Sequence, residues 1–484
     1  MTKEEKGGKS RDLTTGPIAG TLLAFALPTL GSNILQSLNG SINTIWVGHF
    51  LGEAALAATS NANIIMFLMF GAVFGFGMAA TILVGQAMGR GDIDAARRAF
   101  GTAVGMVLFG AVVIAAIGWM LAPQILTILA TPGDAFPLAL AYLRVIFLSL
   151  PASMMVVLVM MGLRGTGDST TPFWFMVLSV VIDAGLNPFL IAGIGPFPRL
   201  GIAGSATATL VANHVSLACL VVYVYARDLP LRLRGGELAY LKPHGPLVRT
   251  IKAKGLPMGA QMLVMSSAGL AMAGLVNRQG VDTVAAYGVA QQLWTYIQMP
   301  ALAIGAAVSA MTAQNIGAGR WDRVGRITRA GLITNLALTG VMVVVTTLFD
   351  RAVLGLFLGQ DSPAMPIAAH IQLVAAWGFV LFGATMVLFS TVRANGAVIA
   401  PLVMLFVSMY PVRLGFAAAL LPAWGADALW WSFPAGSAAN LVMAVAYYRY
   451  GNWRKGALLT PEPADCEEQA HADAEPAGRV HPTG

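Results

Sequence analysis

The chain consists of long apolar runs that alternate with short polar segments. A membrane-spanning helix needs roughly 20 apolar residues, and about twelve runs of that length follow one another along the sequence. The pattern therefore predicts an all-α polytopic membrane protein. The predicted helices are 18–47, 54–84, 98–122, 136–161, 170–192, 201–226, 250–277, 282–312, 326–349, 364–391, 398–421 and 425–449.

One polar stretch inside the chain is longer than the others and divides it in two. It runs from Arg227 to Lys254 and is rich in Lys and Arg. After Trp453 the sequence turns to Pro, Glu, Asp and Ala with no apolar period, which is typical of disorder. The predicted organisation is a tail (1–16), an N-lobe of six helices (17–227), a linker (228–249), a C-lobe of six helices (250–453) and a disordered tail (454–484).

The two halves resemble each other in sequence. Gln86–Gly89 matches Gln314–Gly317 at an offset of 228 residues, and Gly162–Gly167 matches Thr391–Gly396 at an offset of 229. Because six helices are an even number, both repeats insert in the same direction. We expect them to be related by an axis along the membrane normal, with a cavity between the two bundles. This plan favours a transporter over a channel or a membrane enzyme, and two lobes in one chain make a monomer sufficient.

Composition and charge narrow the class further. The chain is 57% hydrophobic and 11% charged, whereas about a quarter of the residues in soluble domains are charged. This excludes an ordinary cytosolic enzyme and a nucleic-acid module. If both termini are cytoplasmic, every Lys and Arg lies on the cytoplasmic side except Arg144, Arg199, Arg278, Arg351 and Arg413. This distribution obeys the positive-inside rule, so we expect a multi-pass protein of the cell (inner) membrane with cytoplasmic termini.

Asp183 is the acid that lies well inside a predicted helix. A carboxyl group in hydrocarbon is costly and marks a functional site by default. Asn187 follows four residues later on the same face, and Pro188 is expected to kink the helix and free a carbonyl group nearby. Because burial disfavours the charged form of a carboxyl group, this acid is suited to bind and release a proton. A purely structural role, with Asp183 bonded to Asn187 or to a neighbouring helix, is the alternative.

Three other helices carry polar side chains at helical spacing. Such side chains line a cavity or bond neighbouring helices to one another, and the pattern alone leaves both interpretations open. In the eighth predicted helix they lie near the aromatic residues Trp294 and Tyr296, which suit flat cationic ligands. The candidate substrate-binding residues are Gln36 and Asn39 in the first helix, Ser205, Thr209 and Asn213 in the sixth, and Tyr287, Gln291 and Thr295 in the eighth.

Six short segments follow one another along the chain. They are Ala26–Pro28, Trp46–Gly48, Leu56–Ala58, Gly85–Gly89, Gly162–Asp168 and Leu186–Pro188. Together they resemble the multidrug and toxic compound extrusion (MATE) family. The resemblance implies two bundles of six helices that open as a V to one side at a time. It also implies export of amphipathic, often cationic compounds against an inward flow of protons or sodium ions, with a first-lobe pocket built by the first and fifth helices.

The chain departs from the family at its acidic positions. Many members have an Asp where this chain has Asn43, and an Asn followed by an Asp where this chain has Asp183 followed by Asn187. The second-lobe acids of sodium-coupled, NorM-like members are also missing: 257–277 and 364–391 contain no Asp or Glu. We therefore predict coupling to protons through Asp183, Asn187 and Asn43, with sodium as the alternative ion.

The sequence thus favours a proton-coupled multidrug exporter of small organic cations, embedded in the lipid bilayer. A lipid-linked oligosaccharide flippase is the second candidate, but it needs basic residues in its cavity. Apart from those counted on the cytoplasmic side, Arg144 and Arg413 are the basic residues within predicted helices, and both are expected near helix ends. A membrane enzyme would need a motif such as His-Glu-x-x-His, and an ATP-driven pump would need a Gly-x-x-x-x-Gly-Lys-Ser/Thr loop. The sequence contains neither, so we expect no catalytic residues, no metal site and no cofactor.

Overall fold

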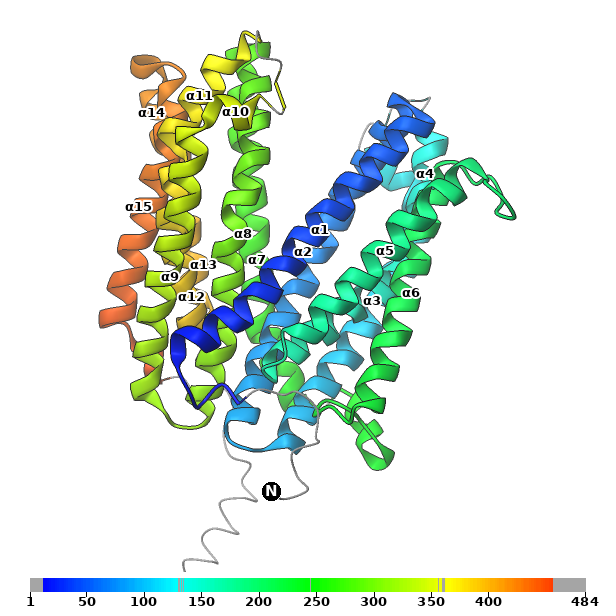
Figure 1. Ribbon diagram of the computed structural model, residues 1–484, viewed down its shortest axis with the longest axis vertical. Helices are drawn as coiled ribbons and strands as arrows, with labels where there is room; N and C mark the ends of the chain where they lie inside the picture. Colours follow the sequence, from blue (N-terminus) through cyan, green and yellow to red (C-terminus); the bar gives the residue numbers. More distant parts are fainter. Residues whose placement is uncertain are drawn as a thin grey trace, which may run out of the picture.

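Two bundles of long α-helices lie close together at one end of the molecule and diverge towards the other (Figure 1). The structure is a computed structural model that describes residues 12–128, 131, 133, 135–243, 245–355, 357–358 and 362–455. The side chains of 53–54, 57, 60–65, 67–70 and 72 are not part of that description. Most of the predicted tails, residues 1–11 and 456–484, lie outside the described residues.

The N-lobe is built from six helices, each of which covers one predicted range. They are α1 (Ile18–Leu51), α2 (Glu53–Gly89), α3 (Ile93–Ile128), α4 (Phe136–Gly165), α5 (Thr170–Ala192) and α6 (Ile202–Ala226). α5 runs through Pro188 as one helix. It ends at Ala192, and the left-handed backbone of the following Gly193 (φ 72°) lets the N–H of Ile194 also donate to the carbonyl of Phe189, as is common at helix C-termini.

The C-lobe repeats this plan with two interruptions. The tenth predicted helix is divided at Ala376, and the eleventh contains a π-helix that the sequence did not predict. The C-lobe helices are α7 (Gly245–Val276), α8 (Val281–Gly317), α9 (Trp321–Leu348), α10 (Asp350–Leu354), α11 (Ala364–Ala375), α12 (Trp377–Ala394), α13 (Ile399–Val407), the π-helix Ser408–Leu414, α14 (Gly415–Trp424) and α15 (Asp427–Tyr450).

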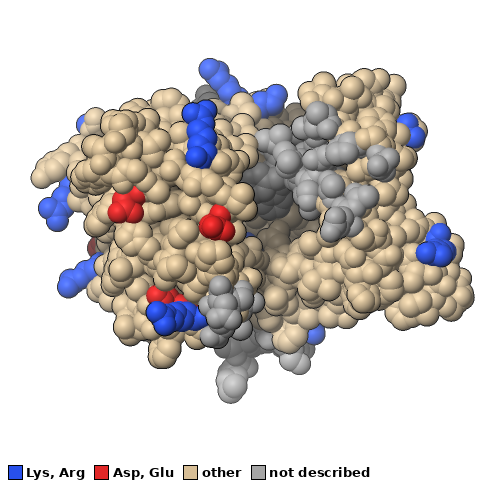
Figure 2. All heavy atoms as spheres, turned by 90° about the horizontal axis from the view of Figure 1, so that it is seen from above, with Lys and Arg blue, Asp and Glu red and all other residues tan. Residues whose placement is uncertain are grey.

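These lengths confirm the predicted all-α membrane fold. Within the described part of the chain, ten helical segments are long and apolar enough to cross a membrane. α2 and α15 occupy the other two predicted ranges. At the end where the lobes diverge, the surface carries few charged side chains, and the two lobes flank a central hollow (Figure 2).

The first half of one helix in each lobe packs on the other lobe. Leu22 and Phe25 of α1 share a buried cluster with Ile304 and other residues of the C-lobe. In the same way Ile251 of α7 belongs to a buried cluster of the N-lobe. Each lobe therefore contributes to the core of the other, and this exchange joins the lobes at one end only.

Reciprocal hydrogen bonds reinforce that junction. The Gln86 side chain of α2 donates to the carbonyl of Ala394 at 2.7 Å. The Gln314 side chain of α8 donates to the carbonyl of Gly165 at 3.0 Å. Gln86 and Gln314 are equivalent positions of the sequence repeat, so one interaction is made twice. We call the pair the glutamine clasp.

The clasp requires the helix backbones to come very close. A Cβ atom on Gly89 would collide with the carbonyl oxygen of Gln314, and one on Gly317 would collide with the carbonyl oxygen of Gln86. Glycine is thus the residue that permits the approach of α2 to α8. The repeated Gln-x-x-Gly segments found in the sequence thus form part of the contact surface between the lobes.

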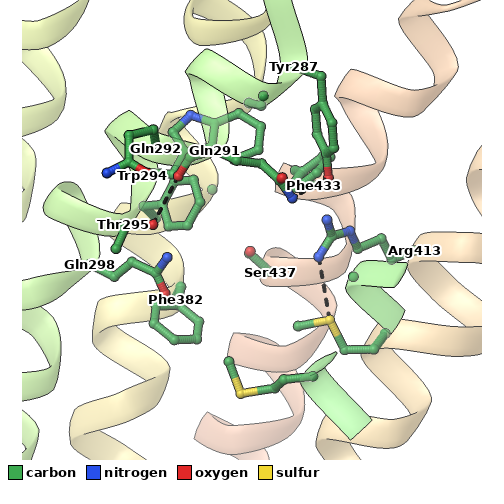
Figure 3. A pocket seen from close by; sticks show the side chains of 17 residues that line it. Tyr287, Gln291, Gln292, Trp294, Thr295, Gln298, Phe382, Arg413, Phe433 and Ser437 are labelled. Carbon is green, nitrogen blue, oxygen red and sulfur yellow. Dashed lines mark hydrogen bonds between the residues drawn. The ribbon is translucent and has the colours of Figure 1, made fainter. Parts of the chain in front are cut away.

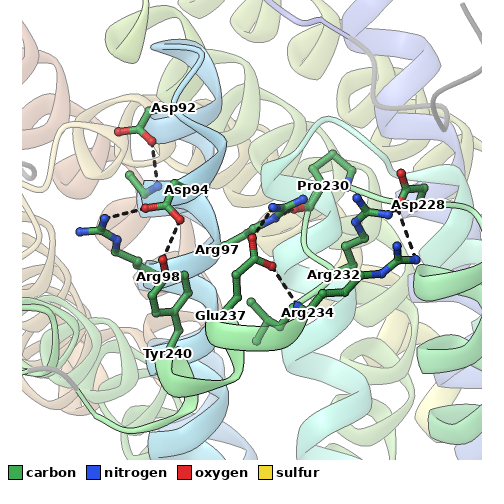
Figure 4. Close-up of polar contacts among 12 residues, drawn as sticks. Asp92, Asp94, Arg97, Arg98, Asp228, Pro230, Arg232, Arg234, Glu237 and Tyr240 are labelled. Carbon is green, nitrogen blue, oxygen red and sulfur yellow. Dashed lines mark hydrogen bonds and ion pairs between the residues drawn. The ribbon is translucent and has the colours of Figure 1, made fainter. Parts of the chain in front are cut away.

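The predicted linker is folded onto the N-lobe (Figure 4). Its 3-10 helix, Gly235–Leu241, lies on α3. There Glu237 pairs with Arg97 at 2.6 Å, and the Tyr240 hydroxyl donates to Asp94 at 2.8 Å. A Cβ atom on Gly105 of α3 would collide with the carbonyl oxygen of Leu241. α7 then begins at Gly245, earlier than the predicted 250.

The glycine contact at the clasp generates a first prediction. Gly89→Ala should lower the apparent Tm of the detergent-solubilised protein, because overpacking a close contact costs about 1–3 kcal/mol. The matched control is Gly325→Ala in α9, where an added Cβ meets nothing within 4 Å. The control should be neutral or slightly stabilising, since Ala favours a helix over Gly. Equal Tm values for the two variants, measured by thermal-shift fluorimetry, would contradict the tight contact.

Candidate functional site

Polar side chains from three helices of the N-lobe meet around one acid. Asp183 and Asn187 lie one turn apart on α5, and Asn39 and Asn43 lie one turn apart on α1. Thr209 joins them from α6. We call these five residues the N-lobe polar cluster. Asp183 is only 1% exposed and Asn187 is fully buried, whereas Asn39, Asn43 and Thr209 are half-buried.

The carboxylate of Asp183 is held by neutral donors. Its Oδ2 accepts hydrogen bonds from the side-chain amides of Asn39, at 2.8 Å, and Asn43, at 3.0 Å. Its Oδ1 accepts one from the Thr209 hydroxyl at 3.1 Å and a longer one from Asn187 at 3.4 Å. In the described chain no Lys or Arg pairs with it, so amide and hydroxyl dipoles alone stabilise the charge.

The same amides are able to accept as well as donate. Asn39 and Asn187 each present a buried Oδ1 atom without a partner among the described residues. A protonated carboxyl group donates one hydrogen bond, and rotation of a side-chain amide exchanges its NH₂ for its oxygen. The cluster thus has acceptors for a protonated Asp183 and donors for an ionised one. This is what a residue that alternates between the two forms requires.

The structure brings together five of the predicted N-lobe residues and leaves three at other places. Gln36 is exposed on α1. Ser205 contributes its carbonyl oxygen to Thr209 at 3.4 Å. The amide of Asn213 donates to two serine hydroxyls of α4, Ser149 at 3.2 Å and Ser153 at 2.8 Å. Sequence reasoning missed these serines, although their spacing of four residues was the available signal.

A second site lies in the C-lobe (Figure 3). A cavity of about 460 Å³ is lined by the predicted residues Tyr287, Gln291 and Thr295 of α8. The Gln291 side chain donates to the Tyr287 hydroxyl at 3.0 Å. Most of the remaining lining residues are apolar, and the aromatic ones among them are Trp294, Phe379, Phe382 and Phe433.

Arg413 enters this cavity from the π-helix and corrects a sequence expectation. It was expected near a helix end, but it lies in the middle of the apolar segment Ile399–Trp424. Its guanidinium carbon is 3.6 Å from the centre of the Phe433 ring. The sequence feature that could have identified this position is an arginine within an apolar run.

Comparison with known proteins agrees with this architecture. A family model described as MatE matches residues 28–189 and 257–418. The chain is 34% identical over 433 residues to "Probable multidrug resistance protein YoeA" of Bacillus subtilis (strain 168), covering 89% of this chain and 93% of the relative. It is 29% identical over 456 residues to "Probable multidrug resistance protein YpnP" of the same organism, covering 93% and 99% of the two chains.

Solved structures share the fold. The structure described as "Outward-facing conformation of a multidrug resistance MATE family transporter of the MOP superfamily" superposes with a TM-score of 0.84 at 20% sequence identity. The superposition covers 93% of this chain and 98% of the other. Both halves of the chain are therefore in the arrangement that this fold requires.

The enclosed carboxyl group generates a second prediction. Dicyclohexylcarbodiimide is an apolar reagent that reacts with protonated carboxyl groups. It should modify Asp183 increasingly as the pH is lowered, because the protonated fraction then rises. Mass spectrometry of the peptide that contains Asp183 measures the adduct, and Asp183→Asn should remove it. Adducts confined to surface acids, such as Asp427, would argue against a titrating acid at this position.

Proposed function

The chain belongs to the MATE family, and we propose that it is a multidrug efflux transporter that exports amphipathic organic cations in exchange for protons. The observation that carries the proposal is the buried Asp183, held by amides and a hydroxyl, with no cationic partner among the described residues. The curated relatives at 34% and 29% identity are both named as probable multidrug resistance proteins.

Exchange follows from competition for one negative charge. In the ionised form, the carboxylate makes the N-lobe attractive to an organic cation. A proton on Asp183 neutralises that charge and removes the attraction. Each ligand therefore lowers the affinity for the other, and this reciprocity is a property of any pair of linked binding equilibria. A proton that enters from outside can in this way displace a bound drug.

Alternating access supplies the direction of transport. The glutamine clasp holds the lobes together at one end, while they diverge at the other (Figure 1). We place the clasp end in the cytoplasm, because most Lys and Arg residues lie in the segments that join helices there. In this orientation both termini are cytoplasmic and the present state opens outward. Breaking the clasp is then the step that opens the protein to the cytoplasm.

Sodium coupling is the second candidate, and one observation favours it. The unpartnered amide oxygens of Asn39 and Asn187 lie beside a carboxylate. A hard cation such as sodium binds oxygen atoms of this kind. Protons remain our first choice because 257–277 and 364–391 contain no acid. The two ions are separated by the following experiment.

Inverted membrane vesicles test the coupling ion directly. With a pH gradient that is acid inside, vesicles that contain the protein should accumulate ethidium, and Asp183→Asn should reduce this accumulation to background. The matched control is Asp427→Asn, which removes a surface carboxylate bonded to His370 at 2.8 Å and should leave accumulation unchanged. Full transport by Asp183→Asn would exclude Asp183 as the coupling acid. Accumulation driven only by a sodium gradient would replace the proton with sodium.

The position of Asn187 allows a rescue experiment. Its amide nitrogen donates to Asp183 Oδ1 at 3.4 Å and to Asn43 Oδ1 at 2.8 Å, so a carboxyl group at 187 would reach the same neighbours. In the double variant both neighbours are side-chain amides, which rotate to present their NH₂ groups to it. The double variant Asp183→Asn/Asn187→Asp should therefore regain part of the proton-driven transport that the single variant loses. Normal expression without any recovery would show that the acid must sit at 183.

A further inference from the structure

Arg413 is a charge within the C-lobe span that has no counter-ion among the described residues. Among the described residues its Nε atom is buried without a partner. Its terminal nitrogen has only the sulfur of Met409, at 3.6 Å, which is a weak acceptor. A charge in a membrane span is retained where it faces a cavity and serves a ligand, an ion pathway or a partner. Arg413 lines the C-lobe cavity (Figure 3).

None of the described acids of the C-lobe is in position to pair with it. Asp282, Asp322, Asp350 and Asp427 are each the first or second residue of a helix, and Asp361 lies outside the described residues. Asp427 is also bonded to His370. The side chains that face Arg413 across the cavity from α7, α8, α12 and α15 are all uncharged.

The local fold directs this side chain into the cavity. Ser408–Leu414 forms a π-helix with Pro411 inside it, and a π-turn changes the direction in which its residues point. Such turns occur frequently at functional sites. On α15, Gly436 leaves room for the arginine stem, since an added Cβ atom would lie 3.0 Å from Cβ of Arg413. The Phe433 ring then supports the guanidinium from one face.

We propose that the C-lobe cavity binds the carboxylate of an amphipathic aromatic substrate through Arg413. A guanidinium group binds a carboxylate through two parallel hydrogen bonds, while Trp294, Phe379 and Phe382 offer ring surfaces for an aromatic scaffold. The amide of Gln298 and the hydroxyl of Ser437 line the same cavity and complete the polar contacts.

This assignment deepens the proposed function and rests on it. Arg413 repels a simple organic cation, whereas it attracts the carboxylate of a zwitterion. A zwitterion satisfies both lobes in turn, with its cationic group attracted by Asp183 and its carboxylate by Arg413. Besides the simple cations that the N-lobe attracts, the substrate class therefore includes aromatic zwitterions, whose carboxylate binds in the C-lobe cavity.

A pair of dyes that differ in one group tests the inference. Rhodamine B is a zwitterion with a free carboxylate, and its ethyl ester is a cation with the same aromatic scaffold. Binding of each dye to the purified full-length protein in detergent is measured by fluorescence anisotropy. The wild type should bind rhodamine B more tightly than its ester. Arg413→Gln should lower the affinity for rhodamine B by about tenfold, as expected for loss of one hydrogen-bonded charge pair. It should not lower the affinity for the ester.

Arg144→Gln is the matched control. Arg144 also lies within a membrane helix with its guanidinium over an aromatic ring, at 4.9 Å from the centre of Trp119, but it belongs to the N-lobe and does not line the C-lobe cavity. Its loss should leave both affinities unchanged. The proposal would be overturned if Arg413→Gln lowered the affinities for both dyes equally, or lowered neither affinity. If Arg413→Gln does not fold, a wild type without preference for rhodamine B overturns it equally.

The outcome is separable from that of the proposed function. Dye binding in detergent needs no ion gradient. Ethidium transport does need a gradient, and ethidium itself carries no carboxylate for Arg413 to bind. Failure of proton-driven ethidium accumulation together with a retained preference for rhodamine B would reject proton antiport and keep the anion site. Retained accumulation without that preference would reject the anion site alone.

Discussion

The glutamine clasp is the contact on which the arrangement of the lobes depends. Gln86 and Gln314 each donate to a backbone carbonyl of the opposite lobe, and glycines next to them allow the backbones to touch. Hydrogen bonds between neutral groups contribute only about 0.5–1.5 kcal/mol each. A junction of this kind holds one state without making it permanent. It suits a molecule whose two bundles must separate and rejoin at this end during each cycle.

The two lobes hold opposite charges and keep them apart. Asp183 is stabilised by amides and a hydroxyl in the N-lobe, and Arg413 by the Phe433 ring in the C-lobe. A direct ion pair between them would neutralise both and leave little affinity for an ion or a drug. Each lobe instead retains a charge that has no counter-ion among the described residues, within a membrane-spanning bundle. An unpaired charge is unfavourable in each lobe, and binding of a ligand relieves that unfavourable free energy.

Much of the fold was predictable, because long apolar runs and repeated motifs directly report membrane helices and internal symmetry. The grouping of Asn39, Asn43 and Asp183 was likewise predictable from helical spacing and family resemblance. Two features were not. The π-helix around Arg413 depends on how Pro411 and α15 pack in three dimensions, and no local periodicity records that. The packing of α1 on the C-lobe places predicted N-lobe residues in the opposite core, and it arises only when both bundles are assembled.

The docked linker also has a mechanical consequence. Leu241 is fixed on α3 and α7 begins at Gly245, so the tether between the anchored segment and the C-lobe spans only a few residues and reaches at most about 10–14 Å. α7 has 32 residues and is therefore about 48 Å long. Its first half also packs on the N-lobe, where Ile251 belongs to a buried cluster, so the second half, about 24 Å long, acts as the lever. A rotation of about 10° at the middle of the helix moves its far end by roughly 4 Å, calculated from that length. Small rotations near the junction of the lobes are in this way enlarged towards the opposite membrane face.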